Sequence, residues 1–267
     1  MHLIHQPDVV QSIKLHSNEI RSYQQEGFLF LPGLLDSPTA DAARRETLEV
    51  LSVGANLSAD DASGRGAQTH KLIQSSQYLV GSTLDQVVNS PNLNAIAAQL
   101  MGGASSLYLP FTAVKTGGGG GRFAFHQDNQ YTRFVDGMLG INIWIALVPM
   151  TPENGCLQIC PRSHLRGTLD ADAESDGHRK VKIEPQDFLP LRMRPGDAVA
   201  FTRLTVHGSG QNDTNHPRVG YGVQFYRDDV RAIWDNESPR LLKGSNRHPV
   251  GPVDKLTPPD PKGRDGH

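Results

Sequence analysis

Two histidines and one aspartate in this chain have residue types and a spacing that suit a metal site. His126 and Asp128 are separated by one residue, and His207 lies far downstream. In an extended strand, residues i and i+2 point to the same side, so His126 and Asp128 would aim at one point while Gln127 faces away or slants across. Two imidazoles and one carboxylate on one face of an octahedral metal leave three positions open. This arrangement suits non-heme Fe(II) that holds a chelating co-substrate together with O₂.

Other interpretations of these three residues stay open at this point. The chain has 11 His and 28 acidic residues, so an isolated His-x-Asp pair also arises by chance. His207 by itself is compatible with a polar residue in a Gly-rich loop. The lack of a thiolate in the set disfavours a structural zinc site. A zinc-dependent hydrolase would also need a general base on a neighbouring element, and we find no such motif.

Further motifs follow the His-x-Asp pair in a fixed order. They are Asn142-Ile-Trp144-Ile-Ala-Leu147, Thr151-Pro-Glu153-Asn154-Gly155-Cys-Leu157 and Pro161-Arg162-Ser163-His164, with Arg218 beyond His207. In order and spacing this pattern resembles the phytanoyl-CoA dioxygenase family of Fe(II)/2-oxoglutarate oxygenases, from about Ile20 to Tyr226. Arg162 departs from the family pattern, which has Gly there, and this change is expected to reshape a turn beside the pocket.

The resemblance implies three cofactors and co-substrates, namely Fe(II), 2-oxoglutarate and O₂, with His126, Asp128 and His207 as the iron ligands. A dicarboxylate in a partly dry pocket needs a bidentate guanidinium at its distal end, and Arg218 has this role in the resemblance. Ser209 would assist the same carboxylate. Trp144 would line the co-substrate pocket, although a plain core position is the alternative. Four further co-substrate contacts that the resemblance implies are Gln127, Lys71, Tyr108 and Thr112, and a solvated surface position is the alternative for Lys71.

The substrate pocket is expected to use the polar residues that follow the metal motif. These are Asn129, Gln130, Tyr131 and Arg133, with Arg203 and Arg162 adding positive charge. Such a lining favours a small polar or anionic substrate over a bare alkyl chain. The alternative is that these loop arginines are simply solvated.

The activity implied by the resemblance is hydroxylation of an unactivated C–H bond, with release of succinate and CO₂, and we expect the substrate to be a small polar metabolite or natural-product intermediate. Halogenases of this superfamily replace the carboxylate ligand with a small residue, so Asp128 disfavours halogenation. Desaturation, epimerisation and ring formation use the same cofactors and remain open. A non-catalytic jelly roll that binds a ligand is a more remote alternative, which the loss of a metal ligand or of Arg218 would have favoured.

Length and composition set the broad class. With 267 residues, 37% of them apolar, one domain over residues 1–267 is expected, with a core at about 17–230 and an extended tail at 235–267. No apolar run is long enough to span a membrane, and no secretory signal is visible. A net charge of −2 provides no basic field for nucleic acid. We therefore expect a cytoplasmic enzyme with a small-molecule substrate, either monomeric or homodimeric, with Cys156 and Cys160 as reduced, buried thiols on one face of a strand.

The order of elements predicts a mainly β protein with helical cover. Helices are expected at 18–26, with Ser17 as its cap, at 37–53 and at 91–101. Strands are expected at 28–31, 106–115, 123–128, 140–148, 156–160, 181–183, 198–202 and 219–227. Short strands separated by Gly, Pro, Asn and Asp are typical of a jelly roll. The resemblance specifies a double-stranded β-helix of cupin-like type. Gly117–Gly121 is expected to be a hairpin loop rather than a phosphate cradle, since no Lys-Ser/Thr follows it.

Overall fold

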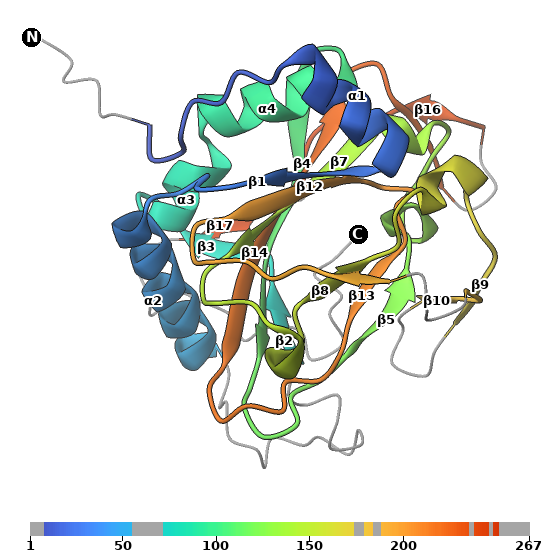
Figure 1. Ribbon diagram of the computed structural model, residues 1–267. Coiled ribbons are helices and arrows are strands. Elements are labelled where there is room, and N and C mark those ends of the chain that lie inside the picture. The colour runs from blue at the N-terminus through green and yellow to red at the C-terminus, as the bar shows by residue number, and fades with distance from the viewer. Residues whose placement is uncertain are drawn as a thin grey trace, which may run out of the picture.

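The computed structural model places two antiparallel sheets against each other, with helices on the outer side of the larger one (Figure 1). It describes residues 8–54, 72–173, 179–183, 188–234, 238–245 and 248–250. The larger sheet has the strand order β1-β12-β7-β14-β4-β2, and the smaller one has the order β11-β8-β13-β5. This arrangement confirms the predicted jelly roll with helical cover.

The strands of the two sheets come from distant parts of the chain. The larger sheet consists of β1 (Phe28–Leu31), β12 (Ala198–Thr202), β7 (Gly140–Ala146), β14 (Arg218–Arg227), β4 (Ser105–Lys115) and β2 (Leu72–Ser75). The smaller sheet consists of β11 (Leu189–Pro190), β8 (Leu157–Ile159), β13 (His207–Ser209) and β5 (Phe123–His126). Short pairings join β9 (Ala171–Ala173) to β10 (Arg179–Val181), β15 (Arg231–Ile233) to β6 (Arg133–Phe134) and β16 (Arg240–Leu241), and β3 (Gln77–Leu79) to β17 (His248–Val250).

Four helices cover the outer face of the larger sheet: α1 (Ser17–Glu26), α2 (Ser37–Gly54), α3 (Thr83–Val88) and α4 (Pro91–Met101). Local sequence explains where α4 begins and ends. The Ser90 hydroxyl accepts a hydrogen bond from the amide of Leu93, Pro91 occupies the first turn, and Gly102 ends the helix in the left-handed conformation at φ 70°. The cap of α1 differs from the prediction, because His16 is the capping residue and Ser17 is already helical.

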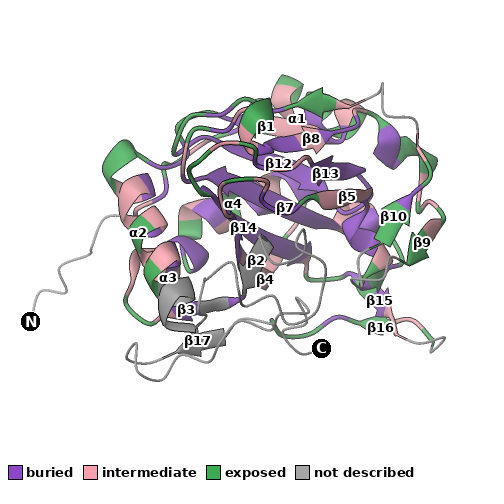
Figure 2. Ribbon diagram, turned by 90° about the horizontal axis from the view of Figure 1, so that it is seen from below, coloured by how far each residue is buried: buried purple, intermediate pink, exposed green. Residues whose placement is uncertain are grey.

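Successive residues of a strand face opposite sides, so the strands of the larger sheet present one face to the apolar core and the other to the site. Ile141, Ile143 and Ile145 of β7 pack with helical residues in the main apolar cluster, as do Val219 and Tyr221 of β14. The residues between them point to the opposite face, toward the smaller sheet. The central strands β12, β7 and β14 are buried on both faces (Figure 2). The inward face therefore carries the polar residues within an otherwise apolar sheet.

Several local predictions need correction. The strand predicted to run through Asp128 ends at His126, and Asp128 begins a 3₁₀ turn. Gly117–Gly121 does not close a hairpin, because β4 and β5 belong to different sheets. The amides of Gly118, Gly119 and Gly120 donate to the carbonyls of Thr214 and Asn212 instead.

The segment predicted as an extended tail contains β16 and β17, which pair with β15 and β3. Residues 251–267 lie outside the described residues. None of the helices in the described part of the chain is both long enough and apolar enough to cross a membrane. Cys156 and Cys160 are free and buried, as predicted, but they belong to different apolar clusters rather than to one face.

Candidate active site

His126, Asp128 and His207 meet between the two sheets, although β5 and β13 carry the histidines from distant parts of the chain. One ligand atom from each lies within 4.8 Å of the others, and all three residues are buried. The Nε2 atoms of His126 and His207 lie 3.8 and 3.7 Å from Asp128 Oδ1. Gln127 has extended backbone angles, φ −114° and ψ 137°. His126 and Asp128 therefore point to the same side, even though the strand itself has ended.

The backbone fixes the tautomer of both histidines. His126 Nδ1 lies 2.7 Å from the carbonyl oxygen of Ala124, and His207 Nδ1 lies 3.0 Å from that of Thr205. A carbonyl oxygen only accepts, so Nδ1 carries the proton in each ring. The lone pair of each neutral imidazole is then on Nε2, directed at the point that Oδ1 also faces. This is the usual way in which a metal-binding histidine is oriented.

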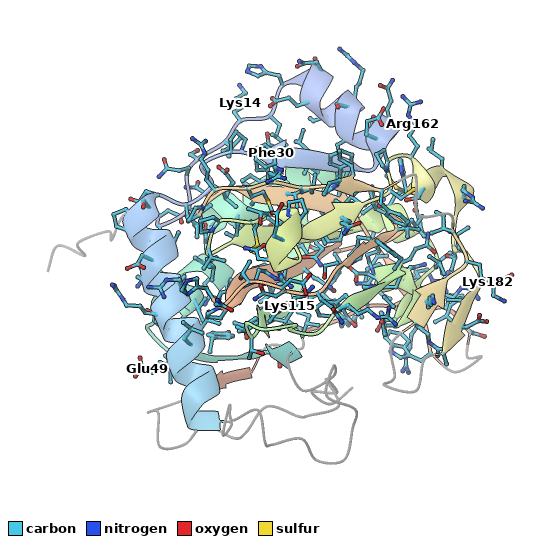
Figure 3. All side chains as sticks on the ribbon, turned by 60° about the horizontal axis from the view of Figure 1, so that its bottom comes forward. Lys14, Phe30, Glu49, Lys115, Arg162 and Lys182 are labelled. Atoms are coloured by element: carbon cyan, nitrogen blue, oxygen red, sulfur yellow. The ribbon has the colours of Figure 1, made fainter. Side chains whose placement is uncertain are left out.

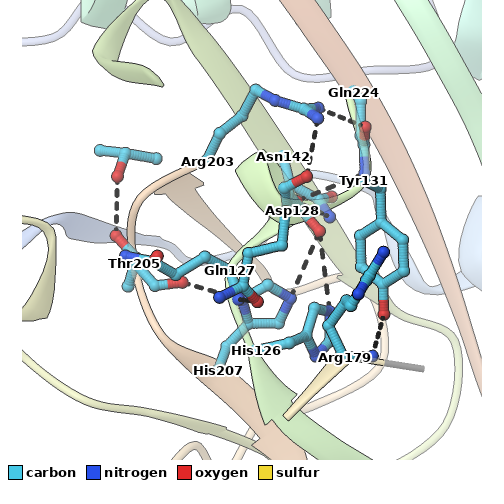
Figure 4. Close-up of polar contacts among 12 residues, drawn as sticks. His126, Gln127, Asp128, Tyr131, Asn142, Arg179, Arg203, Thr205, His207 and Gln224 are labelled. Atoms are coloured by element: carbon cyan, nitrogen blue, oxygen red, sulfur yellow. Dashed lines mark hydrogen bonds and ion pairs between the residues drawn. The ribbon is translucent and has the colours of Figure 1, made fainter. Parts of the chain in front are cut away.

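A buried hydrogen-bonded chain holds the carboxylate of Asp128 (Figure 4). Its Oδ2 accepts from Gln224 Nε2 at 3.3 Å and from Asn142 Nδ2 at 3.4 Å. Arg203 donates from Nη1 to Gln224 Oε1 at 3.0 Å and from Nη2 to the backbone carbonyl of Asp128 at 2.9 Å. Since a guanidinium only donates, Arg203 turns the Gln224 oxygen toward itself and the amide NH₂ toward Asp128. Oδ1 is thereby left to face the histidines.

Arg218 opens β14 on the same inward face as Gln224 and is almost fully buried, at 2% exposure. Its Nε and Nη2 atoms are buried without a hydrogen-bond partner. The guanidinium carbon lies 5.3 Å from the centre of the Trp144 ring, whose buried Nε1 also has no partner. Burial lowers the pKa of Arg218 to about 10, against the opposing influence of Cys156. An unpaired buried cation is costly, so this end of the interior suits an anionic ligand.

Close packing fixes the position of the Trp144 ring beside Arg218. A Cβ on Gly220 would lie 2.1 Å from Cζ2 of Trp144. Only a glycine allows the indole ring to lie against β14 at this point. The Trp144 ring also packs against Phe111, at 5.9 Å between ring centres. Trp144 therefore forms a rigid wall beside the Arg218 guanidinium.

Comparison with known proteins agrees with this geometry. The family model described as Phytanoyl-CoA dioxygenase (PhyH) matches residues 23–220. Methylphosphonate hydroxylase of Gimesia maris is 30% identical over 210 residues, which cover 76% of this chain and 78% of that protein. The chain belongs to the phytanoyl-CoA dioxygenase family. The ectoine dioxygenase of Nocardia farcinica is a further relative, 25% identical over 79% of this chain and 78% of its own length.

Solved structures share the fold of this family member. EvdO2 from Micromonospora carbonacea var. aurantiaca, complexed with 2-oxoglutarate, has a TM-score of 0.67 and 20% identity, and the match covers 88% of this chain and 96% of that one. The epimerase SnoN, in complex with Fe³⁺, alpha ketoglutarate and nogalamycin RO, has a TM-score of 0.65 and 20% identity, covering 89% of this chain and 96% of that one.

This protein is an Fe(II)- and 2-oxoglutarate-dependent dioxygenase. Two independent observations support the fit of its residues to Fe(II) and to 2-oxoglutarate. The two Nε2 atoms and Oδ1 converge as a facial set of nitrogen and oxygen donors without a thiolate, which suits Fe(II). The unpaired nitrogens of Arg218 suit a carboxylate of the co-substrate.

Several predicted co-substrate contacts lie elsewhere. The amide of Gln127 is buried and bonds to backbone atoms of Gly167, Leu204 and Leu169, so it braces a loop rather than facing the pocket. Thr112 shares its face of β4 with Val114, which packs against the helices, because alternate residues of a strand face opposite sides.

Two further predictions of this kind concern Tyr108 and Lys71. Tyr108 bonds to the Thr132 hydroxyl at 2.7 Å. It stands seven positions from Lys115, the cross-strand partner of Arg218, which is about 23 Å along β4. Tyr108 therefore cannot share a carboxylate with Arg218. Lys71 lies outside the described residues.

The predicted substrate contacts fall into two groups, those whose side chains bond within the protein and those that remain accessible. Asn129 is buried and bonds to Phe134 and Thr168, and Gln130 bonds to the carbonyl of Leu169, so both stabilise the turn after Asp128. The 3₁₀ turn directs their side chains into the loop, and substrate binding by them stays a prediction.

The two predicted arginines beyond that turn are not placed as substrate contacts either. Arg203 is committed to Asp128, Thr132 and Gln224. Arg162 is exposed and paired with Glu26. Its left-handed backbone, at φ 63°, matches a position where the family has Gly.

Tyr131 and Arg133 are the predicted substrate residues that remain accessible. Tyr131 is 42% exposed, and its ring meets the ring of His126 edge-on at 5.6 Å between centres. Its hydroxyl accepts from the backbone amide of Arg179 at 3.2 Å, which ties the β9–β10 pair to the ring that lies against His126 (Figure 4). Arg133 is exposed on β6.

Sequence reasoning missed three polar residues of the inward face: Asn142, Gln224 and Lys115. A signal for them exists in strand parity. Asn142 stands two residues before Trp144, Gln224 stands at even spacing from Arg218, and Lys115 ends a strand whose neighbouring residues are apolar. Recognising that signal requires knowing which face of each strand points inward.

Proposed function

We propose that this dioxygenase hydroxylates an unactivated C–H bond of a small polar substrate while 2-oxoglutarate is converted to succinate and CO₂. The observation that carries this proposal is the combination of the convergent His126, Asp128 and His207 with an unpaired buried guanidinium at Arg218. A non-catalytic jelly roll would have no need to keep all four residues.

The residues of this chain would act by holding and orienting the reactants. Bound iron, with 2-oxoglutarate and O₂, supplies the oxidising chemistry. Arg218 would bind the distal carboxylate of 2-oxoglutarate in the bidentate manner of a guanidinium, and Ser209 and Trp144 would line that end. Arg203 and Gln224 would keep Oδ1 of Asp128 aimed at the metal. The burial of all three metal-binding residues would exclude bulk water from the site.

The substrate would enter on the side of Tyr131. The exposed ring of Tyr131 stands against His126. The exposed Arg133 begins β6 two residues further along, and the backbone amide of the exposed Arg179 in β10 donates to the Tyr131 hydroxyl. Such a rim suits a polar or anionic compound. The names of two relatives, methylphosphonate hydroxylase and ectoine dioxygenase, refer to small polar compounds and support the same class.

A succinate-release screen tests this proposal. Purified protein with Fe(II), 2-oxoglutarate and O₂ is incubated with short phosphonates, cyclic amino acids and acyl-CoA thioesters, and the product of any coupled reaction is identified by mass. We expect coupling with a small polar compound and a product that has gained one oxygen. A product that has lost two hydrogens, or an isomer of unchanged mass, would refute hydroxylation in favour of desaturation, ring closure or epimerisation. Coupling only with long-chain acyl-CoA would refute the small polar substrate.

A further inference from the structure

Lys115 is a titratable side chain buried in the interior of the protein (Figure 3). It is the last residue of β4 and the direct cross-strand partner of Arg218 in β14. Its Nζ donates to Ser209 Oγ at 2.7 Å, to the carbonyl of Gly155 at 3.3 Å and to the carbonyl of Gly210. The amine therefore joins β4 to β13 and to the turn before β8.

The contact with Ser209 fixes the direction of one proton. When an anion bound at this end keeps the amine protonated, the ammonium group has donors and no acceptor, so the Ser209 oxygen then accepts from Lys115. The hydroxyl proton of Ser209 then points away from Nζ and is available to an acceptor in the pocket. Ser209 faces the pocket because it lies on the same face of β13 as His207, two residues away.

The charges around Lys115 are unbalanced. The groups that influence its ionisation are Arg218 and the thiol of Cys156, and the ring of Phe123 lies 5.8 Å from Nζ. Burial, with the repulsion of Arg218, lowers the pKa of Lys115 to about 6. Neither Lys115 nor Arg218 has a carboxylate partner in the described part of the chain. An anion bound beside Lys115 and Arg218 would favour the protonated form of Lys115 and stabilise the charge of Arg218.

We propose that Lys115 is a positioning residue for the distal carboxylate of 2-oxoglutarate, which turns the Ser209 hydroxyl toward that carboxylate and adds a second positive charge beside Arg218. This inference rests on the proposed role of Arg218. It makes Lys115 a determinant of specificity, because a keto acid without a distal carboxylate gains nothing from it. A purely structural Lys115 would only link the Gly155 and Gly210 segments.

The test compares two ligands on the Fe(II)-loaded protein without O₂, by calorimetry. 2-Oxoglutarate has a distal carboxylate, whereas oxalate chelates the metal without reaching the Arg218 end. Lys115→Met keeps the length of the side chain and removes its charge. We expect it to weaken 2-oxoglutarate binding about tenfold or more, the effect of losing a charge-assisted interaction, with oxalate binding unchanged. Arg162→Met, at an exposed basic residue, is the control.

Ser209→Ala provides an independent arm if Lys115→Met does not fold. It should also weaken 2-oxoglutarate binding selectively, and the double variant should lose less than the sum of the two single losses, because Lys115 acts through Ser209. The inference is overturned if either single variant binds 2-oxoglutarate like the wild type, or if both ligands weaken equally. Arg218→Met distinguishes failure of the proposed co-substrate pocket from failure of the role proposed for Lys115. If it also leaves 2-oxoglutarate binding unchanged, the proposed co-substrate pocket fails; if it weakens binding while Lys115→Met does not, only the role of Lys115 fails.

Discussion

Replacing Arg218 by methionine should separate co-substrate binding from stability. The side chain is buried, and its Nε and Nη2 atoms have no hydrogen-bond partner within the protein. A carboxylate bound there would gain the strong charge-assisted contacts of a guanidinium in a dry pocket. Removing one partner of such a buried pair costs about 2–5 kcal/mol of binding free energy. This range corresponds to a loss of affinity of about 30-fold to several thousandfold. Lys115 and Ser209 would still be present at the same end, so the lower half of the range is expected.

The stability of the co-substrate-free protein should respond in the opposite direction. Burial lowers the pKa of Arg218 to about 10, which reflects the free-energy cost of keeping this cation in the interior. Methionine removes that cost and still fills most of the space. The melting temperature without ligand should therefore stay the same or rise, while 2-oxoglutarate affinity falls. Anaerobic titration of the Fe(II) protein, followed by the visible charge-transfer band, measures the affinity, and calorimetry measures the melting temperature. Unchanged affinity, or a fall in both quantities together, would refute the assignment of Arg218.

Three further predictions concern single residues. Asp128→Ala should weaken Fe(II) binding in an anaerobic titration without unfolding the protein, and full iron affinity in this variant would contradict the facial set. The buried Lys115, with its pKa lowered from 10.5 to about 6, binds fewer protons in the folded than in the unfolded state between these values. The stability of co-substrate-free protein should therefore rise with pH across that window, by up to about 1.4 kcal/mol per pH unit. Urea denaturation at several pH values should show this slope in the wild type and not in Lys115→Met, and equal slopes would contradict it. Gly220→Ala forces a Cβ to within 2.1 Å of the Trp144 ring and should cost about 1–3 kcal/mol of stability. Gly210→Ala, whose added Cβ would lie 3.9 Å from Gln158 Nε2, is the matched control, and equal stability of the two variants would refute the packing argument.

The sequence predicted the parts of the site that depend on local spacing. His126 and Asp128 are held by one extended residue between them, and Arg218 is placed by the start of a long strand whose alternate residues are apolar. Both features are short-range consequences of strand geometry, which a sequence reveals directly. The order and approximate bounds of the main strands followed for the same reason.

The supporting residues could not be predicted in this way, because their roles depend on pairing between distant strands. Gln224 supports Asp128 only because β14 lies beside β7 with its even-numbered residues facing inward. Lys115 lies beside Arg218 only through the register of β4 against β14. Conversely, Asn129 and Gln130 were predicted to bind substrate because they follow the metal motif, and a short 3₁₀ turn is enough to direct them elsewhere. Adjacency along the chain does not determine which side chains share a cavity.

The two buried arginines illustrate the difference between a supporting residue and a binding residue. Arg203 and Arg218 have the same exposure, 2%. Arg203 uses both terminal nitrogens on Gln224, Asp128 and Thr132, and its guanidinium lies 4.3 Å from the Phe134 ring centre. It therefore has little capacity for a ligand, and its charge is balanced in part by Asp128. Arg218 has two unpaired nitrogens and a second cation, Lys115, beside it. A buried cation of the first kind fixes the geometry of the Asp128 carboxylate, whereas one of the second kind suits an anion from outside, the role that we propose for the distal carboxylate of 2-oxoglutarate.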